Sequence, residues 1–166
     1  MSVDFFETSC KESARKDSLF GICDDQIGAK AYTYINDADK WIAKVKNNDC
    51  VELEFTAIDN CIKIFDEKTK QQESSCDGML TFRESIYLVE LKKQGTGGWL
   101  PDAIGQLRNT IRLLTKHHNL DRFRYKKAYA CNKKHPNFTV IDNEFGKIFF
   151  NETKFRIDAQ AEIVIK

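Results

Sequence analysis

The sequence predicts a mixed α/β (α+β) domain, in which a central β-sheet with a hairpin is flanked by helices. The first observation is the run 85–91, which is β-branched and apolar on both faces and is typical of a central strand. The second is the apolar stretch 78–82, which predicts the other arm of a hairpin with its turn at Arg83-Glu84. The third is a helix over 101–118, whose apolar residues recur every three to four positions.

The remaining elements follow in order along the chain. Residues 1–36 are expected to form an N-terminal segment that is helical in pieces, and residues 37–46 a short helix with acidic residues at its start and one apolar face. Residues 50–58 alternate cleanly and predict a strand, with a second strand at 61–65. Further strands are predicted at 125–131, 138–141, 147–150 and 163–165, and a flexible glycine-rich loop at 93–98. We expect a single domain over 1–166, with its core at 37–131 and a C-terminal β extension at 132–166.

Composition excludes several classes of protein. Hydrophobic residues make up 42% of the 166 residues and charged residues 31%, which argues against extended disorder. No apolar stretch approaches the roughly 18–20 residues that a membrane span needs. Residues 1–7 have neither the basic start nor the apolar core of a signal peptide. A cytoplasmic location without a membrane partner is therefore expected.

The six cysteines are scattered along the chain, and no two are closer than eleven residues. Structural zinc sites usually need close pairs such as C-x-x-C, which this sequence lacks. We interpret the cysteines as reduced thiols that serve as small apolar residues. A Cys/His nucleophilic pair stays open, although no local signature supports one.

A carboxylate and an ammonium extend the face of the central strand that begins as core. Side chains alternate along a strand, so Glu90 and Lys92 point to the same side as Ile86 and Leu88. Placing charged groups on such a face costs free energy unless something compensates them. This pattern marks the end of the strand as a candidate site.

The hairpin brings a second carboxylate to the same place. If Phe82 pairs with Ser85, the same register puts Asp77 opposite Glu90, with Cβ atoms about 4.5–5.5 Å apart. Two carboxylates held so close repel each other unless a proton or a cation lies between them. Carboxylate and carbonyl oxygens suit Mg²⁺ or Mn²⁺. A three-residue loop, which would remove the facing geometry, stays open because the turn lacks the Gly or Asn that two-residue hairpins prefer.

Basic residues follow this motif in one block. Residues 1–91 carry 11 Lys/Arg and 18 Asp/Glu, a net charge of −7, whereas residues 92–134 carry 11 and 2, a net charge of +9. A basic surface beside a carboxylate pair suits a phosphodiester substrate. The alternative is a solvated helix face followed by a charged loop. The candidate nucleic-acid contacts are Lys93, Arg108, Arg112, Lys116, Arg124, Lys126 and Lys127.

These elements resemble the PD-(D/E)xK nuclease superfamily, the fold shared by many restriction endonucleases, archaeal Holliday-junction resolvases and RecB-type nucleases. The resemblance covers roughly residues 37–131 and rests on Asp77 in a hairpin, Glu90-Leu91-Lys92 in the next strand, and Gln106 in the helix that follows. It implies a restriction endonuclease-like core. It also implies that Asp77, Glu90 and the Leu91 carbonyl hold Mg²⁺ or Mn²⁺. Lys92 would orient or deprotonate the attacking water, and Gln106 would lie beside the site.

The sequence departs from the family pattern at three points. Cys76 stands where the family has a proline, and Thr110 stands where RecB-like members carry a tyrosine. Many members also supply an upstream acid from the first helix or its neighbourhood. Here the candidates are Glu52 and Glu54, which fall on a predicted strand. Their other interpretation is an exposed strand face.

The sequence therefore predicts a Mg²⁺-dependent phosphodiesterase or endonuclease that acts on nucleic acid, with DNA favoured over RNA. One alternative is a catalytically inactive domain of the same fold that serves as a protein-interaction or regulatory module. The acidic first half and the basic segment 92–134 would also suit a homodimer or another protein partner. Another alternative is a nucleic-acid-binding protein without catalysis.

Overall fold

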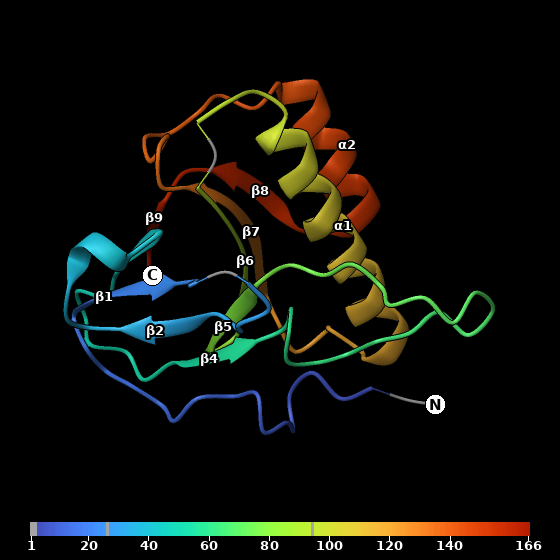
Figure 1. Ribbon diagram of the computed structural model, residues 1–166, viewed down its shortest axis with the longest axis horizontal. Coiled ribbons are helices and arrows are strands. Elements are labelled where there is room, and N and C mark those ends of the chain that lie inside the picture. Colours follow the sequence, from blue (N-terminus) through green and yellow to red (C-terminus); the bar gives the residue numbers. More distant parts are fainter. Residues whose placement is uncertain (1–2, 26, 94) are drawn as a thin grey trace.

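The computed structural model describes residues 3–25, 27–93 and 95–166 (Figure 1). Gln94 of the predicted glycine-rich loop and the first two residues of the chain lie outside the described residues. In chain order the elements are β1 (Leu19–Cys23), β2 (Tyr32–Tyr34), the 3-10 turn η1 (Ala38–Lys40), β3 (Ala43–Lys46), β4 (Glu54–Ala57), β5 (Gly78–Phe82), β6 (Ser85–Lys92), α1 (Trp99–His117), β7 (Tyr125–Asn132), α2 (Asn143–Thr153), β8 (Arg156–Ala159) and β9 (Glu162–Val164).

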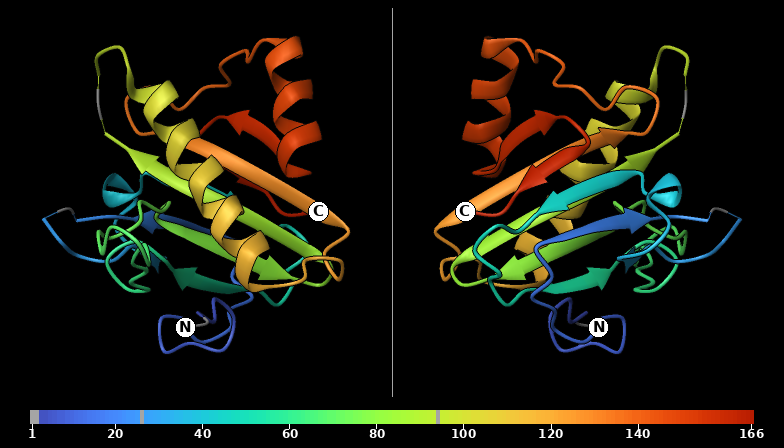
Figure 2. Two further views of the ribbon diagram at one scale, coloured as in Figure 1. Left: turned by 90° about the vertical axis from the view of Figure 1, so that its right-hand side faces the viewer. Right: turned by 90° about the vertical axis from the view of Figure 1, so that its left-hand side faces the viewer.

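The strands form two sheets that lie in separate layers. The larger sheet has five strands in the order β4-β5-β6-β7-β8, antiparallel from β4 to β6 and parallel from β6 to β8. The smaller sheet has four strands in the order β2-β1-β3-β9. Figure 2 shows α1 and α2 over one face of the five-stranded sheet, and the four-stranded sheet against the other face. The mixed α/β class, with a mixed sheet that contains a hairpin, is confirmed. The sheet is not flanked by helices on both sides, because a second sheet, which was not predicted, covers the face opposite α1 and α2.

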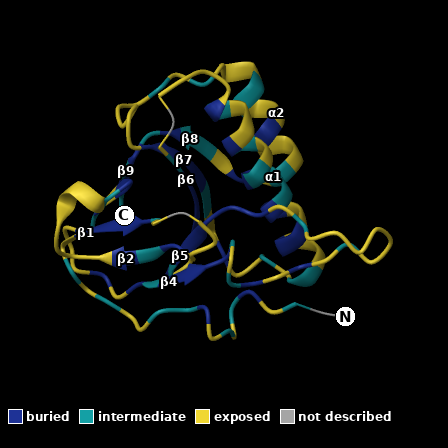
Figure 3. Ribbon diagram, viewed as in Figure 1, coloured by how far each residue is buried: buried dark blue, intermediate teal, exposed yellow. Residues whose placement is uncertain are grey.

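Each face of the five-stranded sheet has its own apolar core. On the helix side, Ile86 and Leu88 of β6 pack in one cluster with Leu107 of α1. On the other side, Tyr87 and Val89 belong to a cluster shared with the four-stranded sheet. Seven of the eight residues of β6 are buried, as predicted for a central strand, and Figure 3 shows the burial concentrated between the layers.

The predicted register of the hairpin is confirmed. Phe82 pairs with Ser85, and Gly78 pairs with Val89. Arg83 adopts a φ of 51°, so a non-glycine residue takes the left-handed conformation that a tight two-residue turn requires. The open alternative of a three-residue loop is thereby excluded.

The N-terminal third differs from the prediction. Within the described part of residues 1–36 there are two strands, β1 and β2, and no helix. Residues 37–46 form only the short turn η1 and then β3, not a helix. In β3 Ala43 and Val45 are buried whereas Lys44 is exposed, which is the period of two of a strand.

The C-terminal segment differs from the two strands predicted at 138–141 and 147–150. Residues 138–141 contain only an isolated bridge, from Thr139 to Ala159. Helix α2 replaces the strand at 147–150, and Asp142 caps it: its Oδ1 accepts the N–H groups of Glu144 at 2.8 Å and Phe145 at 3.1 Å. The strand predicted at 61–65 is also absent. Cys61 instead lies in a turn, where its N–H donates to the carbonyl of Ile58 at 3.1 Å. The strand predicted at 163–165 is confirmed within one residue as β9.

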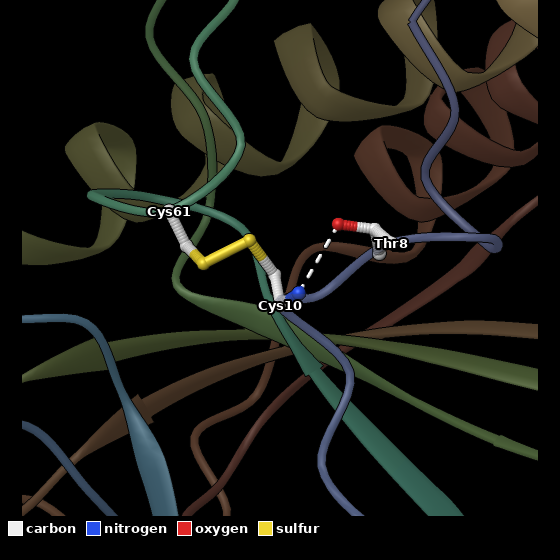
Figure 4. The surroundings of a disulfide bond; sticks show 3 residues. All are labelled: Thr8, Cys10 and Cys61. Carbon is white, nitrogen blue, oxygen red and sulfur yellow. Dashed lines mark hydrogen bonds between the residues drawn. A yellow bond between two sulfur atoms is a disulfide. The ribbon is translucent and has the colours of Figure 1, made fainter.

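One disulfide corrects the interpretation of the cysteines. Cys10 and Cys61 are bonded, with their Cα atoms 5.9 Å apart (Figure 4). They are 51 residues apart in sequence, so no local spacing could indicate the pair. The bond fastens the N-terminal segment to the turn that follows β4. Disulfides persist mainly outside a reducing cytoplasm, and the cytoplasmic location stays a prediction.

Across the described ranges, none of the helices combines the length and the apolar character needed to cross a bilayer.

Candidate functional site

Asp77 and Glu90 face each other at one end of the hairpin, as predicted. The register that pairs Gly78 with Val89 places them opposite each other when it is continued by one residue. Asp77 is 8% exposed and Glu90 is 3% exposed. The Leu91 N–H donates to Asp77 Oδ2 at 2.7 Å, which fixes the Asp77 carboxylate against β6.

Burial raises the pKa of both carboxyl groups. For Asp77 burial is the main cause, the Leu91 N–H opposes it, and the pKa reaches about 7. For Glu90 burial comes first and the charge of Asp77 second, and together they hold the pKa well above its usual range despite Lys92. Without an added cation, the pair therefore resists carrying two full negative charges at neutral pH.

Lys92 joins this pair from the same strand. Its Nζ lies 3.4 Å from Glu90 Oε2 and also forms an ion pair with Asp102 in the first turn of α1. Burial lowers the pKa of Lys92, but the contacts with Asp102 and Glu90 outweigh this, so the pKa lies above its usual value. The lysine is therefore held as an ammonium between two carboxylates.

Gln106 also reaches the site, as predicted. Its amide, oriented with the nitrogen toward the carboxylate, donates to Glu90 Oε1 at 2.9 Å and also to Oε2. A neutral donor on both oxygens fixes the orientation of the Glu90 carboxylate.

Helix α1 presents a line of three polar side chains to the site. Asp102, Gln106 and Thr110 follow one another at intervals of four residues, so they lie on one face of the helix. The first contacts Lys92 and the second contacts Glu90. Thr110 Oγ1 accepts the Cys76 N–H at 2.7 Å, which anchors the residue before Asp77. Thr110 thus positions the backbone that carries the first carboxylate.

Two acids that the sequence analysis missed lie close enough to act on the pair. Burial is the main cause of the raised pKa of Asp77, and the charges of Asp24 and Asp59 add to it. The Asp59 N–H donates to the Cys76 carbonyl at 3.1 Å, which continues the pairing of β4 with the segment before β5. The place of Asp59 in the sequence could therefore have indicated it, because Asp59 directly follows the strand that pairs with 78–82. Asp24 follows β1 in the other sheet, and no local pattern connects it with Asp77.

The predicted upstream acids, Glu52 and Glu54, are not brought to the pair. Glu54 is in register with Thr81, three residues from Gly78, which corresponds to roughly 10 Å along the strand. Its Oε2 lies 3.8 Å from Lys11 Nζ. The strand predicted at 50–58 is confirmed only in part, because β4 begins at Glu54 and Glu52 precedes it. Both acids lie toward the opposite end of β5 from Asp77.

The predicted basic residues do not form one surface beside the pair. Along α1, Arg112 Nη2 contacts Glu73 Oε2 at 2.7 Å, and Arg108 Nε lies 3.4 Å from Glu152 Oε2. Lys116 lies in the last turn of α1, ten residues beyond Gln106, a distance of about 15 Å along the helix. Arg108 and Arg112 therefore have acidic partners within the protein, and Lys116 lies far from the site along the helix.

Most of the predicted basic residues near β7 also lie away from the carboxylate pair. Arg124 precedes the strand, and its guanidinium lies 5.5 Å from the centre of the Tyr125 ring. Lys127 is in register with Tyr87, three residues before Glu90, and Lys126 is one residue further away. Of the predicted set, Lys93 directly follows Lys92 at the end of β6.

The donor set fits a hard divalent cation. Two adjacent buried carboxylates supply oxygen ligands, and a bound cation would allow both to ionise. Among the residues that the structure describes, no group of three or more His, Cys, Asp or Glu side chains is arranged to hold a metal ion. Asp77 and Glu90 would therefore need a backbone carbonyl, such as that of Leu91, and water to complete the coordination.

Comparisons of this chain with protein-family models, with curated proteins and with solved structures found no match. The resemblance to PD-(D/E)xK nucleases therefore stays a prediction. Function has to be inferred from the residues of the site.

Proposed function

We propose that this protein is a Mg²⁺-dependent phosphodiesterase, an endonuclease that acts on nucleic acid and preferentially on DNA. The observation that carries the proposal is the facing pair Asp77 and Glu90, both buried, with Lys92 Nζ 3.4 Å from Glu90 Oε2. The sequence of elements β5-β6-α1-β7, with β6 and β7 parallel, supports a restriction endonuclease-like core of the PD-(D/E)xK type.

Each residue of the site has a role in this proposal. Asp77 and Glu90 would hold Mg²⁺ or Mn²⁺, with the Leu91 carbonyl as a further ligand. The bound ion would supply a Lewis acid for the phosphate and a water of lowered pKa. Lys92, charged through its two ion pairs, would orient the attacking water and stabilise negative charge on the phosphate. Gln106 would keep the Glu90 oxygens aligned.

The direct test is cleavage of supercoiled and linear DNA with Mg²⁺, with Mn²⁺ and with EDTA. Cleavage that requires the metal and disappears in Asp77→Ala is expected, while circular dichroism shows that the variant is folded. Glu54→Gln is the matched control, because it changes an acid at the other end of the β4–β5 pair. Full activity in Asp77→Ala would overturn the assignment.

A second candidate is a catalytically silent domain of the same core that acts as a protein-interaction or regulatory module. The observation that favours it is that Glu90 has two partners within the protein, Lys92 and Gln106. Calorimetry with Mn²⁺ separates the two candidates. Binding that is lost in Asp77→Ala supports the nuclease, and absence of binding in the wild type supports the silent module.

A further inference from the structure

Strand β7 carries a pair of adjacent lysines at each end. Lys126 and Lys127 lie near its start, and Lys133 and Lys134 directly follow its last residue. Because β6 and β7 are parallel and in register, the second pair leaves the sheet at the same edge as Lys92. The two pairs have the same charge on the same strand, but only the second lies at the edge that carries the buried carboxylates.

The second pair is fixed beside the site by its backbone and side chains. The Lys133 N–H donates to the Lys92 carbonyl at 2.9 Å, which extends the pairing of the two strands. The Lys133 ammonium donates to the carbonyl of Asp39 in η1, and it has further protons to donate. A Cβ added at Gly95 would lie 3.2 Å from Lys134 Cδ, so the Lys134 side chain lies against Gly95. Both lysines are exposed.

The first pair is engaged within the protein. Lys126 Nζ donates to the Phe123 carbonyl at 3.1 Å. Lys127 Nζ lies 5.4 Å from the centre of the Tyr87 ring. Both side chains are half-buried, in contrast to Lys133 and Lys134. Because these two side chains are less exposed, this end of β7 presents its ammonium groups less openly to a polyanion.

The second pair can offset the negative charge of the acids at this edge of the sheet. Asp77 and Glu90 are buried at this edge, and the Asp59 N–H donates to the carbonyl of Cys76, directly before Asp77, so several acids share this edge. A nucleic acid that approaches them is repelled unless cations nearby offset their charge. Lysines bind phosphate oxygens without reading sequence, and they make affinity depend on salt.

We propose that Lys133 and Lys134, together with Lys93, hold the sugar–phosphate backbone of the DNA across the ends of β6 and β7, and that Lys126 and Lys127 do not. The inference rests on the proposed function for the identity of the ligand. It moves the nucleic-acid contacts from the helix α1 and the start of β7, where the sequence placed them, to the edge that holds Asp77 and Glu90.

The test compares Lys133→Gln/Lys134→Gln with the matched variant Lys126→Gln/Lys127→Gln. Fluorescence anisotropy of a labelled DNA duplex is measured in EDTA, which prevents cleavage, over a range of KCl concentrations. The first variant should bind on the order of tenfold more weakly at physiological salt, and the slope of log K against log salt should fall by about 2. The second variant should bind like the wild type.

Three results would overturn the inference: no DNA binding by the wild type, equal losses in the two variants, or wild-type binding in the first variant. The backbone hydrogen bond of Lys133 is retained in the first variant, so it should fold. If it does not, Lys134→Gln alone should lower the salt slope by about 1.

The outcomes are separable from those of the nuclease proposal. A wild type that does not cleave with Mg²⁺, but whose binding depends on Lys133 and Lys134, would support the inference and refute the nuclease. A wild type that cleaves, together with a first variant that binds and cleaves normally, would refute the inference alone.

Discussion

The two ends of the five-stranded sheet handle charge in opposite ways. The acid end is where β6 finishes, and there Asp77, Glu90 and Lys92 are largely buried and bonded to one another or to α1. The turn end lies at the β5–β6 turn and the start of β7. There the charges stay close to solvent, as in the Lys11–Glu54 pair, whose side chains are 25% and 42% exposed.

This difference shows at which end of the sheet the burial of charge lowers the stability of the fold. Exposed ion pairs contribute roughly 0–1 kcal/mol, so the turn end gains or loses little from its charges. Burying carboxylates is costly unless a proton, a cation or hydrogen bonds compensate them. A cost concentrated at one end of the sheet is typical of a functional site.

The largest expected contrast between the two ends is in cleavage. Lys92→Met should reduce the rate by about 10³-fold, because a charged group that stabilises the transition state contributes several kcal/mol. Lys127→Met removes the same charge near the turn end and should change the rate by less than about twofold. Single-turnover cleavage with saturating enzyme measures both variants. Similar losses in the two variants would mean that the ends of the sheet are not functionally distinct.

A second contrast concerns two threonines. Thr110→Val keeps the shape of the side chain but leaves the buried Cys76 N–H without its acceptor, so it should lower the free energy of unfolding by about 1–3 kcal/mol. Thr81→Val lies on β5 toward the turn end, where the side chain is half-buried, and should change it by less than about 0.5 kcal/mol. Urea unfolding followed by circular dichroism gives both values. A cost in Thr81→Val as large as in Thr110→Val would contradict the anchoring role of Thr110.

In a third contrast, the substitution at the acid end is expected to stabilise the protein. In metal-free buffer at pH 7.5, Asp77→Asn should stabilise the protein by about 1 kcal/mol, because it removes a buried charge but weakens the bond to Leu91. The folded-state pKa of Asp77 is about 7, above the ordinary value of 3.8, so the wild type loses stability as pH rises between these values. Asp77→Asn should flatten that loss. Glu54→Gln, its control, should not, and a destabilised Asp77→Asn would contradict the argument.

The same two ends show why the sequence predicted part of the site. The hairpin is local: alternation and a two-residue turn are enough to place Asp77 opposite Glu90, whereas Gln106 was predicted only from the resemblance to PD-(D/E)xK nucleases. The basic residues were misplaced because a block that is continuous in sequence runs along α1, back to the turn end, and along β7 to the acid end. Lys127 and Lys133 are consecutive basic residues of that block, yet most of the length of β7 separates them.

The other wrong or missing predictions also arise because packing between distant segments decides the outcome. Asp24 reaches the acid end only through the packing of one sheet on another, which no local pattern encodes. The run 147–150 is rich in phenylalanine and isoleucine, which favour strands, but the Asp142 cap and the burial of Phe149 favour a helix. The cap was visible in the sequence, whereas the surface that buries Phe149 was not.

The smallest expected effect tests the turn end alone. His118 Nε2 accepts the Phe5 N–H at 3.1 Å, which ties the N-terminal segment to the end of α1 and requires a neutral ring. Burial lowers the pKa of His118, and neighbouring His117 and Arg122 act in the same direction, whereas Asp4 opposes them.

Because the folded-state pKa is lowered, this stability is complete above the ordinary value of 6.5 and is lost as pH falls through the folded-state pKa. We expect a loss of a few tenths of a kcal/mol between pH 7 and pH 5, measured by thermal unfolding. His118→Gln, which keeps an acceptor without titrating, should remove this dependence, whereas His117→Gln should retain most of it. Acid weakens the turn end and base weakens the acid end, so each variant should lose only the pH dependence of stability that belongs to its own end. If Asp77→Asn and His118→Gln changed the same part of the pH profile, the two ends would be coupled.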